Sequence, residues 1–298
     1  MISVVVCTYN RAHYLKDTLV HLQNQDAPLD LFEVLVIDNN SNDHTRQVCE
    51  TFYEQYKDFP FRYVMETQQG LSHARNRGIT EARSDVVTFI DDDAFTTPSF
   101  ISAITTYMSS HQDVIALGGK IIPRYENNEP KWMSNYLLPL VAALDLGDSV
   151  KPFPTNKFPI GANMSIRKGA FVEFGDFNVS LGRKGNSLEG SEEKDLFYRI
   201  KKAGHSIIYL PEAVVHHIIP AKRVSLEYIK NQAIGIGKSE RLRTQHLGQF
   251  QKFLFGELVK WGGSLILSLM YILTFRPAKG IMLIRFRLFV TKGILIKD

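Results

Sequence analysis

The amino-acid sequence predicts an α/β fold with a mostly parallel central sheet. Short runs rich in β-branched and aromatic residues alternate with stretches of helical periodicity. The runs cover residues 2–7, 32–37, 61–65 and 86–90, and the helical stretches cover 10–25, 44–56 and 72–82. The first two runs are almost entirely apolar, as expected of strands buried on both faces of a parallel sheet. Such alternation is typical of parallel strands joined by right-handed crossovers.

The second half of the chain carries a weaker pattern. We expect strands at 115–122, 162–166 and 206–210 and a helix at 192–203. With 298 residues, of which 44% are apolar, the chain is long enough to bury a full hydrophobic core.

Charge divides the chain into two regions. Residues 221–298 hold 14 Lys and Arg against 4 Asp and Glu, although the whole chain carries a net charge of only +4, so residues 1–220 are acidic. A basic, apolar tail favours contact with an anionic membrane surface. It lacks the polar and aromatic mixture typical of nucleic-acid-binding segments, and we expect no nucleic acid partner.

The apolar part of this tail is interrupted by charges. Residues 261–275 form an uncharged stretch of 15 residues, shorter than the roughly 20 that span a bilayer. Residues 281–296 include Arg285, Arg287 and Lys292, which suits a helix lying in the membrane interface. We expect peripheral attachment to a membrane. A pair of core helices or an oligomer contact is the alternative.

Cysteine content and the first residues predict a cytoplasmic catalytic domain. Only Cys7 and Cys49 are present, too few for a disulfide framework or a thiolate metal site. The chain also enters the run 2–7 without the basic segment and longer apolar core of a secretory signal. The tail would then meet the cytoplasmic face of the membrane.

Asp91, Asp92 and Asp93 follow the fourth strand directly. Adjacent carboxylates repel one another unless a cation lies among them, and Mg²⁺ or Mn²⁺ bound to a diphosphate would remove that conflict. Ligands of α/β sheets bind outside the carboxyl ends of the strands, where this triplet lies. An acidic turn that faces water is the alternative.

Four segments together resemble glycosyltransferase family 2. They are Ser-Val-Val-Val-Cys-Thr-Tyr-Asn-Arg at 3–11, Leu-Val-Ile-Asp-Asn-Asn-Ser-Asn-Asp at 35–43, Gly-Leu-Ser-His-Ala-Arg-Asn-Arg-Gly at 70–78 and Phe-Ile-Asp-Asp-Asp at 89–93. The resemblance covers roughly residues 1–220 and implies a GT-A fold. It also implies inverting transfer of a sugar from a nucleotide-diphosphate donor, commonly a UDP-sugar, to a hydroxyl of a glycan or lipid-linked acceptor. Residues 1–110 would form the nucleotide-sugar-binding half and 111–220 the acceptor half, with 221–298 as the membrane-associated tail.

The resemblance assigns residues to the donor. The nucleotide-sugar-binding positions it implies are Thr8, Tyr9, Asn10, Arg11, Asp38, Asn40, Ser41, Arg75, Asn76, Asp91 and Asp92. Asp38 would accept a hydrogen bond from the base, and Arg75 would face the diphosphate. Asn40 stands where many relatives have glycine. Ser41 and Asp43 are equally typical of helix capping, and the sequence leaves both roles open.

The resemblance also assigns the metal ligands and a base. Asp93 would touch the metal, Asp91 would reach the metal or the ribose, and His217 would complete the shell. Inverting transfer requires a base that deprotonates the acceptor hydroxyl. The Glu-Asp element of the family matches Glu192-Glu193, so Glu193 is the expected base and Glu192 its rival. Both could instead simply complement a helix N-terminus.

Two weaker candidates and three other functions remain open. His217 and Trp132, the latter a possible sugar-stacking residue, could equally be core residues. A sugar nucleotidyltransferase is disfavoured because the loop at 8–11 lacks glycine. A glycosidase would need two carboxylates but no diphosphate site, and a non-catalytic nucleotide-sugar-binding protein would need no base.

Overall fold

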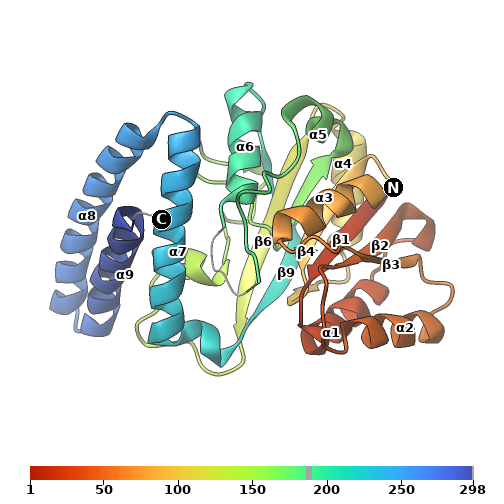
Figure 1. Cartoon of the computed structure of the whole chain (residues 1–298), viewed down its shortest axis with the longest axis horizontal. Coiled ribbons are helices and arrows are strands. Elements are labelled where there is room, and N and C mark those ends of the chain that lie inside the picture. The colour runs from red at the N-terminus through yellow and green to blue at the C-terminus, as the bar shows by residue number, and fades with distance from the viewer. Residues whose placement is uncertain (186–189, 297–298) are drawn as a thin grey trace. The chain divides into compact units, whose positions relative to one another are not determined.

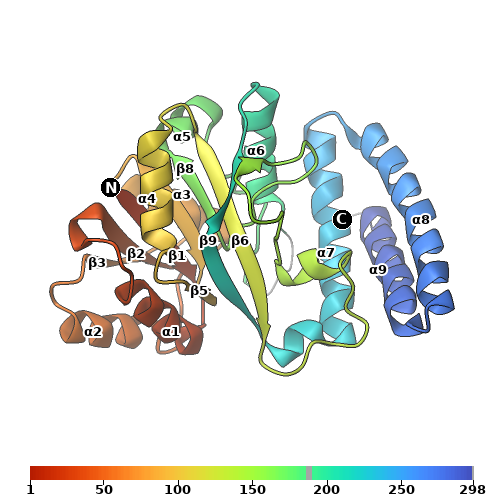
Figure 2. The same ribbon diagram turned by 180° about the vertical axis from the view of Figure 1, so that it is seen from behind.

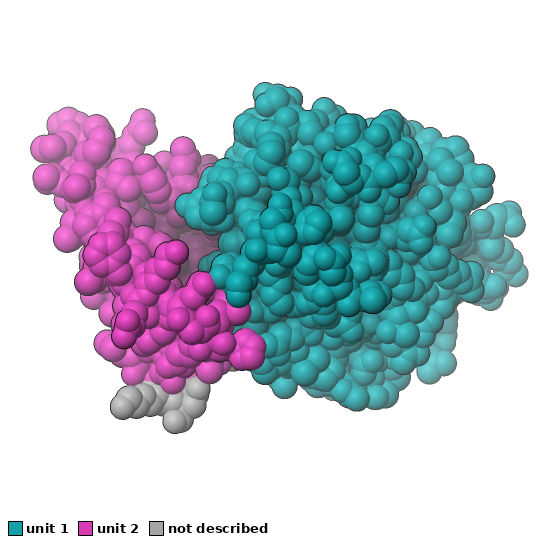
Figure 3. All heavy atoms as spheres, turned by 90° about the horizontal axis from the view of Figure 1, so that it is seen from above, with its two compact units in different colours: residues 1–124, 142–185, 192–218 teal, residues 125–141, 186–191, 219–298 magenta. Residues whose placement is uncertain are grey.

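The structure, a computed structural model, describes residues 1–185 and 190–296. Two compact units are present (Figure 3): residues 1–124, 142–185 and 192–218 form the first, and residues 125–141, 186–191 and 219–298 the second. The boundary at 220 stays a prediction, and the described residues 125–141 group with the C-terminal helices in the second unit.

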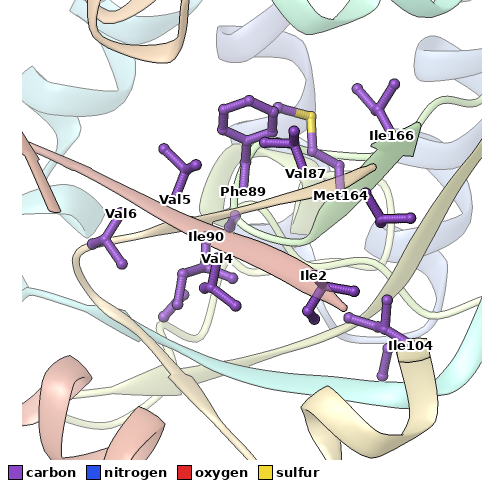
Figure 4. Packing of buried hydrophobic residues seen from close by; sticks show 14 of the residues in the cluster. Ile2, Val4, Val5, Val6, Val87, Phe89, Ile90, Ile104, Met164 and Ile166 are labelled. Atoms are coloured by element: carbon purple, nitrogen blue, oxygen red, sulfur yellow. The ribbon is translucent and has the colours of Figure 1, made fainter. Parts of the chain in front are cut away.

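Four parallel strands form one half of the sheet in the first unit. β1 (Ile2–Thr8) lies between β2 (Phe32–Asp38) and β4 (Val86–Asp91), and β3 (Phe61–Met65) flanks β2. Each strand lies within one residue of its predicted bounds. Their apolar side chains form the core of the unit (Figure 4), where Val4, Val5 and Phe89 are buried.

The other half of the sheet is antiparallel. Within the described residues the order is β3-β2-β1-β4-β8-β6-β9-β5, and β7 also pairs with β9. The bounds are β5 (Ala94–Thr96), β6 (Ala116–Tyr125), β7 (Lys151–Pro152), β8 (Met164–Arg167) and β9 (Ile208–Ile219). The fold is therefore the predicted α/β fold, with a mixed sheet. β9 extends well beyond the expected 206–210, because the apolar and β-branched residues after Pro211 continue the strand.

Helices cover both faces of this sheet. They are α1 (Ala12–Gln23), α2 (Thr45–Gln55), α3 (Leu71–Glu81), α4 (Phe100–Ser110), α5 (Lys168–Phe174) and α6 (Glu192–Lys202). α3 lies in front of the sheet in Figure 1 and α4 in front in Figure 2. A side chain at Gly78 of α3 would collide with Val5 of β1, so this glycine lets the helix approach the sheet closely.

Three long helices dominate the second unit. α7 (Leu226–His246), α8 (Phe250–Leu273) and α9 (Pro277–Leu295) follow one another, and α9 packs against both of the others. Glycines allow this close packing: Gly237 of α7 contacts Gly293 of α9, and Gly280 of α9 contacts Ser268 of α8. Two short 3-10 helices, at Leu138–Val141 and Ala221–Val224, complete the unit.

Candidate active site

The carboxyl ends of the parallel strands bring several predicted site residues to one edge of the sheet. Thr8 at the end of β1 pairs with Asp38 at the end of β2, and Cys7 pairs with Asp91 at the end of β4. Adjacent strands therefore end side by side, as the alternating pattern of strands and helices predicted.

Three potential metal ligands meet beside this edge. β5 begins directly after Asp93 and pairs antiparallel with β9, so that Ala94 lies opposite His217. The Nε2 atom of His217 lies 3.1 Å from Oδ1 of Asp93 and 4.0 Å from Oδ2 of Asp91. One ligand atom from each of these three residues lies within 4.8 Å of the others.

This ligand set fits a divalent transition metal such as Mn²⁺. Carboxylate oxygens suit Mg²⁺ and Mn²⁺ alike, whereas an imidazole nitrogen favours the transition metal. Two atoms bound at right angles to one ion lie about 3 Å apart, close to the separation of His217 and Asp93. Asp93 and His217 are buried, and the Asp91 side chain is 34% exposed. Asp91 is thus the member of the set that is open to a ligand.

Asp92 belongs to the scaffold of this cluster. Its carboxylate accepts a hydrogen bond of 2.8 Å from Thr8, and the Thr18 hydroxyl donates to its backbone carbonyl across 2.6 Å. Burial raises the pKa of Asp92 to about 7, although Arg11 acts in the opposite direction. Asp92 was expected to bind the donor, whereas these contacts tie it to β1 and α1.

Arg11 supplies positive charge to the acidic cluster. Its guanidinium lies 3.3 Å from Asp92 and also pairs with Asp93. Burial alone would lower the pKa of Arg11, but the aspartates raise it more, so the side chain stays charged. We expected a metal ion to offset the repulsion among the three carboxylates, and this arginine offsets part of it.

Two asparagines in left-handed backbone conformation connect the loops after β1 and β2. Asn10 has φ 55° and Asn40 has φ 65°. The backbone N–H of Asn10 donates to Ser41, and the side-chain oxygen of Asn10 accepts from the N–H of Asn42. Asparagine and glycine adopt positive φ most readily. This explains why an asparagine can stand at 40 in place of the glycine of many relatives.

Asp43 accepts hydrogen bonds from the first residues of two helices, although it is the N-cap residue of neither. Its Oδ1 accepts from the backbone N–H of Thr45, at the start of α2, across 3.0 Å. Its Oδ2 accepts from the backbone N–H of Ala12, at the start of α1. Asp43 therefore joins the first turns of both helices.

Asp38 is buried and already bonded within the protein. One carboxylate oxygen accepts from the backbone N–H of Ser41 at 2.9 Å and the other from the Tyr63 hydroxyl at 2.7 Å. Burial and this carboxylate raise the pKa of Tyr63, so the hydroxyl remains a donor. Asp38 therefore shapes the loop beside the half-buried Tyr9.

Asn39 was not expected at the site. Its side-chain oxygen accepts from the backbone N–H of Gly70 at 2.7 Å, and its amide donates to the carbonyl of Gln68 at 2.7 Å. These contacts fix the loop that leads into α3, which carries Arg75. Its position directly after Asp38 was the signal available in the sequence.

Arg75 pairs with the glutamates at the start of α6. Its Nη1 donates to Glu192 across 2.6 Å and lies 3.8 Å from Glu193. We expected Arg75 to face the donor diphosphate, but its side chain is buried against these acids. The side chain of Glu192 is only 3% exposed, whereas that of Glu193 is 21% exposed.

This arrangement shifts the pKa values of Glu192 and Glu193 in opposite directions. Burial and the charge of Glu193 together raise the pKa of Glu192 to about 8, although Arg75 acts in the opposite direction. Burial also acts to raise the pKa of Glu193, but Arg75 and a hydrogen bond from Glu192 outweigh it, so that pKa is lowered. The raised pKa of Glu192 favours its protonated form, and the lowered pKa of Glu193 favours its ionised form.

Asn76 and Trp132 were the remaining candidates for binding the donor and the acceptor. The Asn76 amide donates to the carbonyl of Phe177 at 2.9 Å and accepts from its N–H at 3.0 Å. Asn76, expected at the donor, therefore fixes the segment that follows α5. Trp132 is half-buried in the second unit.

The comparisons with known proteins decide the family. The model of glycosyl transferase family 2 matches residues 3–175. The chain belongs to glycosyl transferase family 2. A relative, glucosyl-dolichyl phosphate glucuronosyltransferase of Haloferax volcanii, is 27% identical over 245 residues, covering 81% of this chain and 76% of that protein.

Solved structures place this family 2 glycosyltransferase among GT-A folds. Mannosyltransferase PcManGT from Pyrobaculum calidifontis, in complex with GDP-Man and Mn²⁺, has a TM-score of 0.67 at 18% identity and covers all of this chain and 88% of its own. Residues 1–349 of S. aureus TarS, in complex with UDP, have a TM-score of 0.55 at 19% identity, covering 84% of this chain and 70% of that one. The predicted fold and family are confirmed.

Proposed function

We propose that this glycosyltransferase is an inverting, metal-dependent enzyme. It transfers a sugar from a UDP-sugar to a hydroxyl of a glycan or lipid-linked acceptor. The observation that carries the proposal is the cluster of Asp91, Asp93 and His217, formed in the same unit as the buried Arg75–Glu192 pair.

The metal ligands are Asp91, Asp93 and His217, of which Asp91 is the most exposed to the donor. A bound Mn²⁺ or Mg²⁺ would neutralise charge on the departing diphosphate. Arg11 places a positive charge beside the buried carboxylates of Asp92 and Asp93.

Glu193 is the base. It accepts the proton of the acceptor hydroxyl while that oxygen forms a bond to the anomeric carbon. The bond from the anomeric carbon to the diphosphate breaks, and its electron pair leaves with the diphosphate. Glu193 suits this role because it is ionised and partly exposed, whereas Glu192 is buried and holds the proton of the pair.

The donor and acceptor classes are supported by relatives. TarS was solved with UDP, although PcManGT was solved with GDP-Man. The relative from Haloferax volcanii is named for a dolichyl phosphate substrate. We therefore propose a UDP-sugar as the donor and a lipid-linked acceptor at a membrane.

We further propose that the second unit attaches the enzyme to the cytoplasmic face of that membrane. α8 is long and apolar enough to cross a bilayer. Its large apolar side chains lie outside and several of its polar ones inside, the reverse of a helix on the surface of a soluble protein. Its exposed large apolar side chains are Leu254, Phe255, Leu258, Val259, Leu265, Ile266, Leu269, Met270, Ile272 and Leu273. Its buried ones are Glu257, Ser264 and Ser268. Large apolar residues outside and small or polar residues at the helix contact are typical of helices in lipid.

The charges around α8 favour a helix lying in the membrane interface. Lys260 lies within the exposed face, with its side chain 53% exposed, and Arg276 lies in the short link between α8 and α9. The exposed stripe of α9 alternates apolar and basic residues: Ile281, Arg285, Leu288, Lys292 and Leu295. Basic side chains of an in-plane helix reach anionic headgroups.

Vesicle binding tests the attachment. The full chain should sediment with phosphatidylcholine vesicles that contain phosphatidylglycerol, and high salt should weaken this binding. A variant with Leu258→Gln, Leu265→Gln and Leu269→Gln should stay in solution. Val172→Gln, which changes an exposed apolar residue of α5, is the matched control and should bind as the wild type does. Unchanged binding by the triple variant, or dimerisation through α8 without vesicle binding, would refute the attachment.

Donor turnover tests the enzyme. UDP-glucose, UDP-N-acetylglucosamine and GDP-mannose are supplied with Mn²⁺, and release of the nucleoside diphosphate is measured. Asp93→Ala should abolish metal-dependent donor binding. Glu193→Gln should bind the donor normally and lose turnover, because only the base is removed. Full turnover by Glu193→Gln would exclude this residue as the base.

A further inference from the structure

The backbone turns sharply directly before the two glutamates of α6. Ser191 has φ 78°, in the left-handed region that a non-glycine residue seldom occupies. The next residue, Glu192, begins α6. A strained residue of this kind persists only where its surroundings hold it.

α7 holds this turn through two consecutive residues. The hydroxyl of Ser191 donates to Oε1 of Glu240 across 3.0 Å, and the N–H of Gly190 donates to the hydroxyl of Ser239, also across 3.0 Å. Ser239 and Glu240 are both buried. Two side chains of one helix therefore fix two adjacent residues of the turn.

Glu240 is itself fixed by a third residue of α7. Arg243 donates to Oε2 of Glu240 across 2.9 Å, which leaves Oε1 for Ser191. A buried ion pair contributes little net stability, because the loss of hydration offsets the attraction. Holding one carboxylate oxygen at a defined point is a role that such a pair performs well.

We propose that Ser239 and Glu240 are positioning residues for the catalytic base. They act through Gly190 and Ser191 on the orientation of the first turn of α6, and hence on Glu193. This inference rests on the proposed role of Glu193.

Variants at the turn test the proposal in the full-length chain. Ser191→Ala and Ser239→Ala each remove one hydrogen bond. Each should lower kcat for nucleoside diphosphate release about tenfold without changing KM for the donor, because small displacements of a base slow the chemical step. Glu240→Gln retains an oxygen that accepts from Ser191 and should keep most of the wild-type kcat, whereas Glu240→Ala should not.

The pH profile and a control separate positioning from folding. Displacing Glu193 from Arg75 weakens the attraction that lowers its pKa, so the acid limb of kcat/KM should move to higher pH in Ser191→Ala. Ser225→Ala removes an N-cap hydrogen bond from the same helix, where Ser225 accepts from the N–H of Tyr228. It should lower the melting temperature and leave kcat and the pH profile unchanged.

The same variants distinguish failure of the positioning role from failure of Glu193 as the base. If Glu193→Gln is inactive while Ser191→Ala and Ser239→Ala retain the wild-type kcat and pH profile, the positioning role is refuted and the base assignment stands. If Ser225→Ala lowers kcat as much as Ser191→Ala does, α7 acts only through general stability, which also refutes it. Full activity of Glu193→Gln removes both claims.

Discussion

The guanidinium of Arg75 donates to the carboxylate of Glu192 across 2.6 Å, and both side chains are buried. Arg75 comes from α3 and Glu192 from α6, 117 residues later. The contact joins the helix expected to serve the donor to the helix that carries Glu193, the proposed base.

Removing Arg75 should destabilise the fold. Arg75→Ala leaves buried carboxylates without their cation, and breaking a buried ion pair in this way costs about 3–5 kcal/mol. The loss should be larger at pH 9 than at pH 6, because Glu192, with a pKa of about 8, is ionised at the higher pH. Urea unfolding at the two pH values measures it. Glu50→Ala, which breaks the exposed Arg46–Glu50 pair, is the control and should change the free energy of unfolding little.

Stability should fall as pH rises, and Glu192 should contribute to this slope. Its pKa is raised from 4.5 to about 8 by folding, so the folded protein binds more protons than the unfolded chain between these values. The contribution is complete below pH 4.5 and is lost as pH rises through 8. Asp92, with a pKa raised to about 7, contributes with the same sign. Urea unfolding of Glu192→Gln should therefore show a shallower slope than the wild type, and an unchanged slope would contradict the assigned proton.

The left-handed backbone conformation of Asn40 predicts how substitutions at this position change stability. Because φ is 65°, Asn40→Ala should cost about 1 kcal/mol of stability, while Asn40→Gly should be tolerated. Thermal unfolding of both variants measures the difference. Equal melting temperatures for the two would show that residue 40 does not need the left-handed conformation.

The parallel half of the sheet was predictable because its signals are local. Each strand is a short apolar run, and a polar loop that follows it directly places Thr8, Asp38 and Asp91 at the strand ends. An apolar run of this kind indicates a strand that is buried on both faces of the sheet. The sequence therefore predicted that the acidic residues lie together at the carboxyl edge of the sheet.

Long-range contacts were less predictable. β5 has three residues, too few for a periodic signal, yet it brings Asp93 and His217 together. The strand carrying His217 was expected to end at 210, because Pro211 resembles a strand boundary. The burial of Arg75 against Glu192 depends on packing between α3 and α6, which no local pattern reports.

The central claim is that Asp91, Asp93 and His217 bind a divalent metal at the donor site. Calorimetric titration of Mn²⁺ in the presence of UDP tests it most directly, with His216→Ala as the control for the neighbouring histidine on β9. The account predicts one Mn²⁺ site in the wild type and in His216→Ala, weakened at least about tenfold in His217→Ala and lost in Asp93→Ala. Wild-type Mn²⁺ affinity in both His217→Ala and Asp93→Ala would contradict it.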